Sequence, residues 1–104
     1  MAQIVVFITA SGKTEAVKIA KGLLKKKLVA CVNIIDRVES FFWWEGKIDR
    51  AKECLLIAKS SRAKLAKVIK SVRLMHSYAV PEIIGLDIAG GSKTYLDWID
   101  DSIR

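Results

Sequence analysis

The fold is decided by residues 28–60, LVACVNIIDRVESFFWWEGKIDRAKECLLIAKS. Residues 28–36 form an apolar, β-branched run that extends through residues 38–44, and residues 48–60 form a second run of the same kind. Such runs predict strands. Glu45-Gly46 between them predicts the tip of a hairpin, although this pair is a weaker turn signal than Asn-Gly.

The predicted hairpin is long compared with a helix of ordinary length. Residues 28–44 as one strand would span roughly 56 Å at about 3.3 Å per residue. A helix of about 14 residues spans only roughly 21 Å. We therefore expect the hairpin either to reach beyond the helices or to bend near Asp36-Arg37.

Four of the eight aromatic residues in the chain, FFWW at positions 41–44, stand beside this tip. Large rings are costly to leave in water. We expect a neighbouring subunit to accept them and place Phe41, Trp43 and Trp44 at a subunit interface. The alternatives are an aromatic cluster folded back on the same subunit and a platform that stacks on a ligand.

The rest of the chain supplies two more strands and three helices. Residues 3–9 and 83–88 read as strands, and residues 13–27 read as a helix. A second helix carries Leu65, Val68, Ile69 and Val72 at helical spacing, and a short last helix opens at Ser92 or Thr94. The order β-α-β-β-α-β plus a C-terminal helix predicts one α+β domain over residues 1–104, a ferredoxin-like sandwich.

Both faces of the predicted sheet are apolar. Ile4, Val6 and Ile8 alternate with Val5 and Phe7, and the other strands repeat this pattern. A sheet with one face in water alternates apolar with polar residues instead. Two helices cover one face only, so the other face requires a partner, and a second copy of the chain is the simplest one. We place Leu56 on this interface.

Composition limits the class of protein. The chain has 104 residues, 52% of them hydrophobic, and a net charge of +7. The lysines follow two helical patterns and are explained by solvated helix faces, so nucleic acid is not the expected partner. No apolar run is long enough to span a membrane and no signal peptide is recognisable, which predicts a cytoplasmic protein without a membrane partner. Cys31 and Cys54 lie in apolar runs and read as free thiols, with a disulfide as the alternative.

Motifs for catalysis are absent from the sequence. SGKT at residues 11–14 resembles a phosphate-binding loop, but Phe7 stands where that motif needs glycine. The strand at residues 48–60 has no aromatic residue for stacking RNA bases. No nucleophile elbow accompanies His76, the only histidine. We therefore expect a protein that is not an enzyme.

His76 is the strongest candidate for a metal ligand, because neutral imidazole binds copper and zinc well. Met75 beside it offers a weaker thioether ligand. The acidic residues Glu45, Glu53, Glu82 and Asp87 are candidate oxygen ligands, but their spacing selects none of them. The alternative is a structural histidine that caps the second helix or bonds a carbonyl.

Taken together, these residues resemble the CutA divalent-cation tolerance family over essentially the whole chain. The matching segments are ACVNI at 30–34, the run from Ser40 to WEGKI at 44–48, Glu53 with its apolar strand, His76–Ile83 as H-x-Y-x-VPEI, and YLDW at 95–98. The resemblance implies a ferredoxin-like homotrimer related in architecture to PII signalling proteins. It also implies a role in tolerance of copper and other divalent metals, with no obligatory cofactor.

The resemblance also suggests where a ligand would bind. In some bacterial members of the family, copper is attributed to a cysteine and two adjacent histidines. The corresponding residues here are Ile8, Met75 and His76, of which only His76 matches, so the resemblance implies at most weak copper binding at His76. The alternative function is a PII-like signalling module. Its clefts between subunits, near Glu45, Lys47 and Tyr78, would hold a small effector or a protein partner.

Overall fold

The computed structural model describes residues 2–104, which form a four-stranded sheet and three α-helices. The elements in chain order are β1 (Gln3–Ala10), α1 (Lys13–Lys25), β2 (Cys31–Trp44), β3 (Lys47–Ser61), a 3₁₀ turn η1 (Arg62–Lys64), α2 (Leu65–Met75), β4 (Ile83–Asp87) and α3 (Lys93–Ser102). The strands lie in the order β2-β3-β1-β4, and all neighbours are antiparallel. The predicted α+β sandwich is confirmed.

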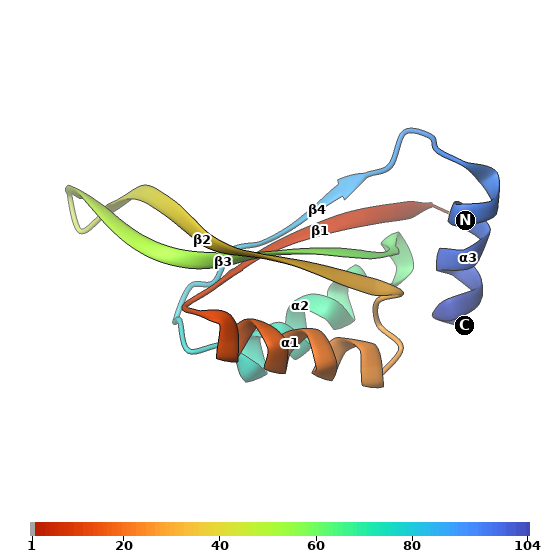
Figure 1. Ribbon diagram of the computed structural model, residues 1–104, viewed down its shortest axis with the longest axis horizontal. Coiled ribbons are helices and arrows are strands. Elements are labelled where there is room, and N and C mark those ends of the chain that lie inside the picture. Colours follow the sequence, from red (N-terminus) through yellow and green to blue (C-terminus); the bar gives the residue numbers. More distant parts are fainter. Residues whose placement is uncertain (1) are drawn as a thin grey trace.

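Helices α1 and α2 lie side by side on one face of the sheet (Figure 1). Even-numbered residues of β1 and the even-numbered residues 54–60 of β3 point towards them and are buried, whereas the odd-numbered residues between them point to the opposite face. The core beneath the helices consists mainly of aliphatic side chains. Its largest members are Ile4, Ile8, Ile19, Leu23, Leu56, Val68 and Val72.

Helix α1 ends two residues earlier than predicted, for a local backbone reason. Lys27 adopts a left-handed conformation with φ 55°, and the Leu28 N–H donates to the Leu23 carbonyl at 3.0 Å. This is the hydrogen bond of a Schellman motif, which closes a helix C-terminus. Residues 26–30 therefore belong to the connection, and β2 begins at Cys31 rather than at Leu28.

The β2–β3 hairpin both bends and extends beyond the helices, towards the left of Figure 1. The bend lies where it was expected, because the strand register shifts between Ile35 and Val38, and Arg37 has φ 61°. The Asp36 carboxylate holds this bulge by accepting the Arg37 N–H at 2.8 Å and the Cys54 thiol at 3.1 Å.

The hairpin tip exposes its aromatic rings in the single chain. The side chains of Phe41, Trp43 and Trp44 are 63%, 72% and 52% exposed. The chain's own core therefore does not cover these rings, which contradicts the alternative of a cluster folded back on the same subunit. A neighbouring subunit that accepts them remains a prediction.

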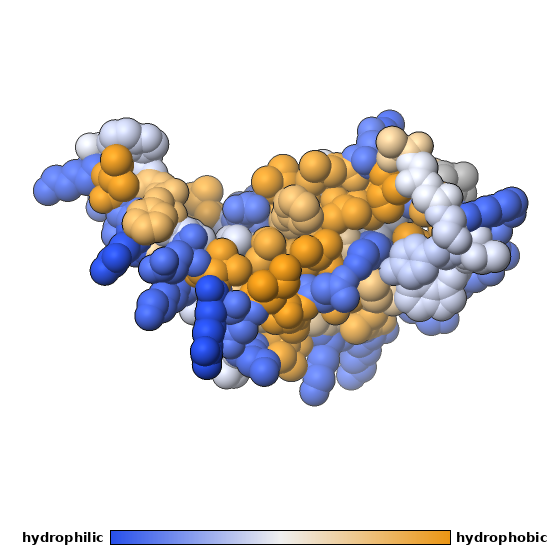
Figure 2. Space-filling model, turned by 45° about the horizontal axis from the view of Figure 1, so that its top comes forward, coloured by the Kyte–Doolittle hydropathy of each residue, from blue (hydrophilic) through white to orange (hydrophobic). Residues whose placement is uncertain are grey.

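The sheet face opposite the helices is apolar and open over its centre, where Figure 2 shows a continuous hydrophobic patch. Cross-strand pairing places Val5 and Phe7 of β1 beside Leu86 and Ile84 of β4 on this face. Leu55 and Ile57 of β3 belong to the same face by their odd position in the register. We call these six side chains, with Ile35, the open face. Ile84 and Leu86 are 50% and 46% exposed.

The prediction for Leu56 was wrong. Leu56 is fully buried, because it pairs with Ile8 and Ile34 on the face that the helices cover. Its neighbours Leu55 and Ile57 point to the open face. The sequence showed two apolar faces but not which of them carries the helices.

Helix α3 covers one end of the open face. Ile99 and Ile103 are buried there, and Gln3 Nε2 donates to the Asp100 carboxylate at 2.9 Å. Tyr95 and Trp98 stay 43% and 44% exposed. The Tyr95 hydroxyl lies 3.6 Å from the thiol of Cys31, and both cysteines are free.

Candidate functional site

A pocket of about 840 Å³ lies between the hairpin and the loop that follows α2. Its hairpin wall is formed by residues 40–44 and 49–51 with Glu53, and its other wall by residues 78–80 with Glu82. Thr9, near the end of β1, closes the base. The aromatic residues 41–44 belong to its lining, and its charged residues are Asp49, Arg50, Glu53 and Glu82.

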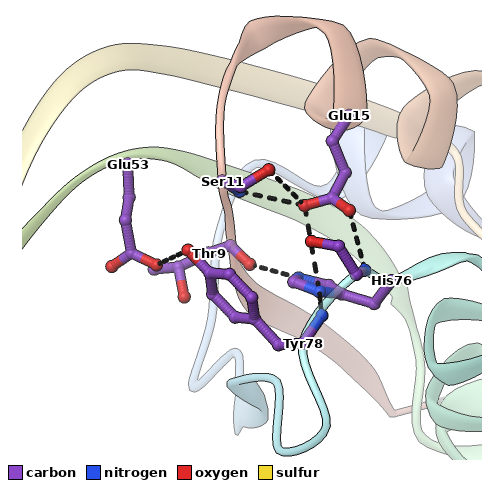
Figure 3. Close-up of polar contacts among 7 residues, drawn as sticks. Thr9, Ser11, Glu15, Glu53, His76 and Tyr78 are labelled. Atoms are coloured by element: carbon purple, nitrogen blue, oxygen red, sulfur yellow. Dashed lines mark hydrogen bonds and ion pairs between the residues drawn. The ribbon is translucent and has the colours of Figure 1, made fainter.

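Glu53 and Tyr78 form the polar centre of this pocket (Figure 3). The Tyr78 hydroxyl donates to Glu53 Oε2 at 2.8 Å, and Glu53 is only 7% exposed. Burial and the neighbouring Glu53 carboxylate raise the pKa of Tyr78 to about 12. Tyr78 is therefore a neutral donor at physiological pH and satisfies one oxygen of a buried carboxylate.

Glu82 lies close enough to Glu53 for their charges to interact. Burial, and then repulsion from Glu53, raise the pKa of the Glu82 carboxyl above its ordinary value. A like charge nearby disfavours the ionised form of a carboxyl group, which is the effect of Glu53 on Glu82. These are two of the four acidic residues that the sequence offered as oxygen ligands, and the structure brings this pair together.

His76 is a buried structural residue rather than an open ligand. Its side chain is 0% exposed. Nδ1 accepts the Tyr78 backbone N–H at 3.0 Å, so that nitrogen carries no proton, and Nε2 donates to the Thr9 carbonyl at 2.7 Å. Neither nitrogen has a free lone pair for a metal ion. The geometry therefore matches the structural alternative for His76 and does not fit the proposed copper ligand.

Met75 does not complete a metal site either. Its sulfur packs into the seam between α1 and α2 against Gly22, where an added Cβ would approach Sδ to 2.7 Å. Among residues 2–104, no three His, Cys, Asp or Glu side chains are grouped in a way that could hold a metal ion.

Glu15 holds the loop that carries His76 and Tyr78, a role that the sequence analysis did not identify. Its carboxylate accepts the N–H and hydroxyl of Ser11, at 2.9 and 3.0 Å, and the Ser77 N–H at 2.8 Å (Figure 3). Burial opposes ionisation, but these hydrogen bonds outweigh it and lower the pKa of Glu15 to about 2. The spacing of Ser11 and Glu15 hinted at a local contact, but the bond to Ser77 is long-range and left no signal in the sequence.

The remaining predicted ligand residues lie elsewhere. Glu45 and Lys47 stand at the hairpin tip, both exposed, and neither lines the pocket that contains Tyr78. The prediction that all three line one cleft between subunits stays a prediction.

Comparison with known proteins gives the family. The model of the CutA1 divalent ion tolerance protein family matches residues 4–102. The divalent-cation tolerance protein CutA of Archaeoglobus fulgidus is 50% identical over 95% of this chain and 96% of its own length. The chloroplastic CutA 1 of rice is 42% identical over 97% of this chain, which spans 57% of that relative.

A solved structure agrees with these sequence relatives. The structure of the Archaeoglobus fulgidus protein, which is described as periplasmic, superimposes with a TM-score of 0.95 at 48% identity, covering 98% of this chain and 99% of that one. The Archaeoglobus protein is named a divalent-cation tolerance protein. The periplasmic and chloroplastic descriptions of relatives leave a cytoplasmic location as a prediction. From its sequence and its fold alike, the chain belongs to the CutA1 divalent ion tolerance family.

Proposed function

We propose that this protein acts in tolerance of divalent metal ions, copper among them, as a non-enzymatic homotrimer in the cytoplasm. The observation that carries the proposal is the family match over residues 4–102. The Archaeoglobus relative carries the tolerance function in its name, and the chain covers almost the full length of that relative.

The open face supports assembly of identical copies. Seven apolar side chains line it, and half of Ile84 and nearly half of Leu86 remain in water in the single chain. Exposed apolar patches of this kind mark interaction sites in proteins. The exposed rings of Phe41, Trp43 and Trp44 at the hairpin tip would be buried by the same assembly. The number three rests on the family resemblance.

Weak cation binding is assigned to Glu53 and Glu82 rather than to His76. The two carboxylates share one pocket, and repulsion between them contributes to the raised pKa of Glu82. A divalent cation between them would remove that repulsion. Carboxylate oxygens alone hold divalent transition metals loosely compared with mixed nitrogen and sulfur sites, in keeping with weak binding.

Copper titration with paramagnetic resonance tests this assignment. The chain contains one histidine, so imidazole nitrogen couplings in the Cu²⁺ spectrum can come only from His76. We expect oxygen coordination without those couplings, and weaker binding in Glu53→Gln and Glu82→Gln. Met75→Leu serves as the matched control and should bind copper as the wild type does. Imidazole couplings, or unchanged affinity in both glutamine variants, would overturn the assignment.

A PII-like effector site is the second candidate, favoured by the pocket itself. Its volume of about 840 Å³ suits a small organic ligand, and its walls combine aromatic rings with the Glu53–Tyr78 pair. A thermal-shift screen of nucleotides and small anions tests it. Stabilisation that disappears in Tyr78→Phe would support an effector, and no stabilisation by any compound would count against it.

A further inference from the structure

The charges of this chain are segregated between its two layers. The helical layer, residues 13–27 and 64–73, contains ten cationic side chains: Lys13, Lys18, Lys21, Lys25, Lys26, Lys27, Lys64, Lys67, Lys70 and Arg73. The same segments contain one carboxylate, Glu15, whose oxygens are occupied by Ser11 and Ser77. The other ten acidic residues lie in the hairpin, around β4 and in α3.

The cations of the helical layer form no ion pair within residues 2–104, and only Lys13 lies near enough to a carboxylate, that of Asp36, to lower its pKa. The ion pairs formed by Lys and Arg in this part of the chain are Arg62 with Asp87, Lys93 with Asp97, and Arg104 with Asp101. Within the layer, Lys26 donates to the Ser71 hydroxyl and Lys64 to the Lys27 carbonyl, so their charges stay uncompensated. Like charges crowded on one surface repel one another, and a polyanion would remove that repulsion.

The outward side of α2 combines these cations with aliphatic surface. Lys67, Lys70 and Leu74 follow one helical row opposite the buried Val68 and Val72. The Leu74 side chain is 78% exposed. It borders a shallow hollow of about 420 Å³ whose other lining residues are Ala66, Ile69, Lys70 and Arg73. Apolar side chains in the hollow are thus flanked by two positive charges.

We propose that this helical layer is a docking surface for an anionic phospholipid bilayer, with Lys67, Lys70 and Arg73 at the phosphates and Leu74 at the acyl boundary. Basic residues near an anionic leaflet attract it, and exposed aliphatic groups add apolar burial. The attachment is peripheral, since none of the helices in residues 2–104 has the length and apolar character needed to cross a membrane.

Nucleic acid fits the same surface less well. Residues 13–30 and 62–75 contain no aromatic residue on which a base could stack. Nine of the ten cations are lysines, whereas the planar fork of arginine is favoured for recognition of nucleic acids. Nucleic acid offers no apolar surface for the exposed Leu74 side chain. A bilayer can take this side chain into its apolar boundary.

The docking surface is independent of the pocket and of the proposed metal binding. It lies on the side of the sheet opposite to the open face (Figure 1), so it stays accessible when copies pack through that face. Failure of the metal proposal would therefore leave the membrane proposal standing, and the reverse also holds.

Vesicle flotation tests the proposal with the full-length protein. We expect the wild type to float with vesicles of phosphatidylcholine and phosphatidylglycerol at low salt, and not with phosphatidylcholine alone. At about 1 kcal/mol per lysine, Lys67→Gln/Lys70→Gln should weaken this binding about thirtyfold. The matched control, Lys52→Gln/Lys93→Gln, removes the same charge from the hairpin and α3 and should bind as the wild type does. Circular dichroism confirms that each variant is folded.

Two further measurements separate the membrane from other polyanions. Leu74→Ser keeps every charge, so we expect it to weaken vesicle binding and to leave any binding to duplex DNA unchanged. No flotation with anionic vesicles at low salt overturns the proposal, as does equal binding by the two double variants. Binding to duplex DNA without binding to vesicles would also overturn it and assign the surface to nucleic acid. If Leu74→Ser binds vesicles as tightly as the wild type does, the proposed contact of Leu74 with the acyl boundary is wrong.

Discussion

A charge placed on the open face should separate the subunits without unfolding them. We choose Ile84→Asp because half of the Ile84 side chain is exposed in the single chain, while its neighbour Phe7 keeps it at the centre of the patch. A matched substitution on the opposite face is Leu56→Ala, at a side chain that is fully buried beneath the helices.

The magnitudes follow from the two environments. Burying the exposed half of Ile84 contributes about 1 kcal/mol per subunit to assembly, since full burial of such a side chain is worth roughly 1.5–3 kcal/mol. An unpaired carboxylate in the interface costs at least about 2 kcal/mol more. The assembly should therefore lose about 3 kcal/mol per subunit, or roughly a hundredfold in affinity. Folding of the subunit itself should lose no more than about 1 kcal/mol.

Leu56→Ala should behave in the opposite way. It leaves a cavity in the core and should lower the free energy of unfolding by about 2–5 kcal/mol. At temperatures well below its melting point it should assemble as the wild type does, because Leu56 does not reach the open face.

Sedimentation equilibrium at micromolar concentration, with circular dichroism on the same samples, measures both effects. The expected pattern is a folded, dissociated Ile84→Asp and a destabilised, assembled Leu56→Ala. A wild type that sediments as a single chain would refute the reasoning. So would an Ile84→Asp variant that assembles with unchanged affinity.

Three other predictions concern the hairpin tip and the pocket. Trp44→Ala should lower the stability of the assembly by a few kcal/mol, seen as a lower melting temperature that depends on protein concentration; an unchanged melting temperature would argue against burial of this ring. Because the pKa of Glu15 is depressed from 4.5 to about 2, its stabilisation is complete above pH 4.5 and disappears as the pH falls towards 2. After solvent screening this stabilisation amounts to about 1–2 kcal/mol. The free energy of unfolding, measured at decreasing pH, should therefore fall more steeply for the wild type than for Glu15→Gln. Parallel curves for the two proteins would contradict the assignment. Glu53→Gln should lower the pKa of Tyr78 from about 12 towards 10. The ultraviolet absorbance of the phenolate, recorded during a pH titration, measures this pKa. Tyr78→Phe identifies the part of the signal that comes from Tyr95.

Local chemistry allowed most of the fold to be predicted. Strand and helix periods, the Glu45-Gly46 turn and the length of the hairpin gave the element order and the bend at Asp36-Arg37. Gly46 indeed has φ 77° and Glu45 φ 49°, as a two-residue hairpin turn requires. The misplaced start of β2 came from Lys27, whose left-handed conformation is not marked by a glycine.

The site was harder to predict because its contacts join distant segments. His76 was predicted as a metal ligand because imidazole binds metals well. In the structure both of its ring nitrogens are hydrogen-bonded to the backbone, one to the Thr9 carbonyl and one to the Tyr78 N–H. Glu53 was one of four acidic candidates among which the sequence spacing did not choose, and only the folded loop brings Tyr78 and Glu82 to it. Leu56 was misassigned because the alternation of side chains along a strand separates its two faces but does not show which face the helices cover.

The three indole rings give this protein a built-in optical reporter. Trp43, Trp44 and Trp98 are 72%, 52% and 44% exposed, and none of them lies in the core beneath the helices. Their emission should thus respond strongly when chains associate and only faintly when that core loosens. Intrinsic fluorescence and far-ultraviolet dichroism recorded together would then resolve dissociation from melting without an attached dye.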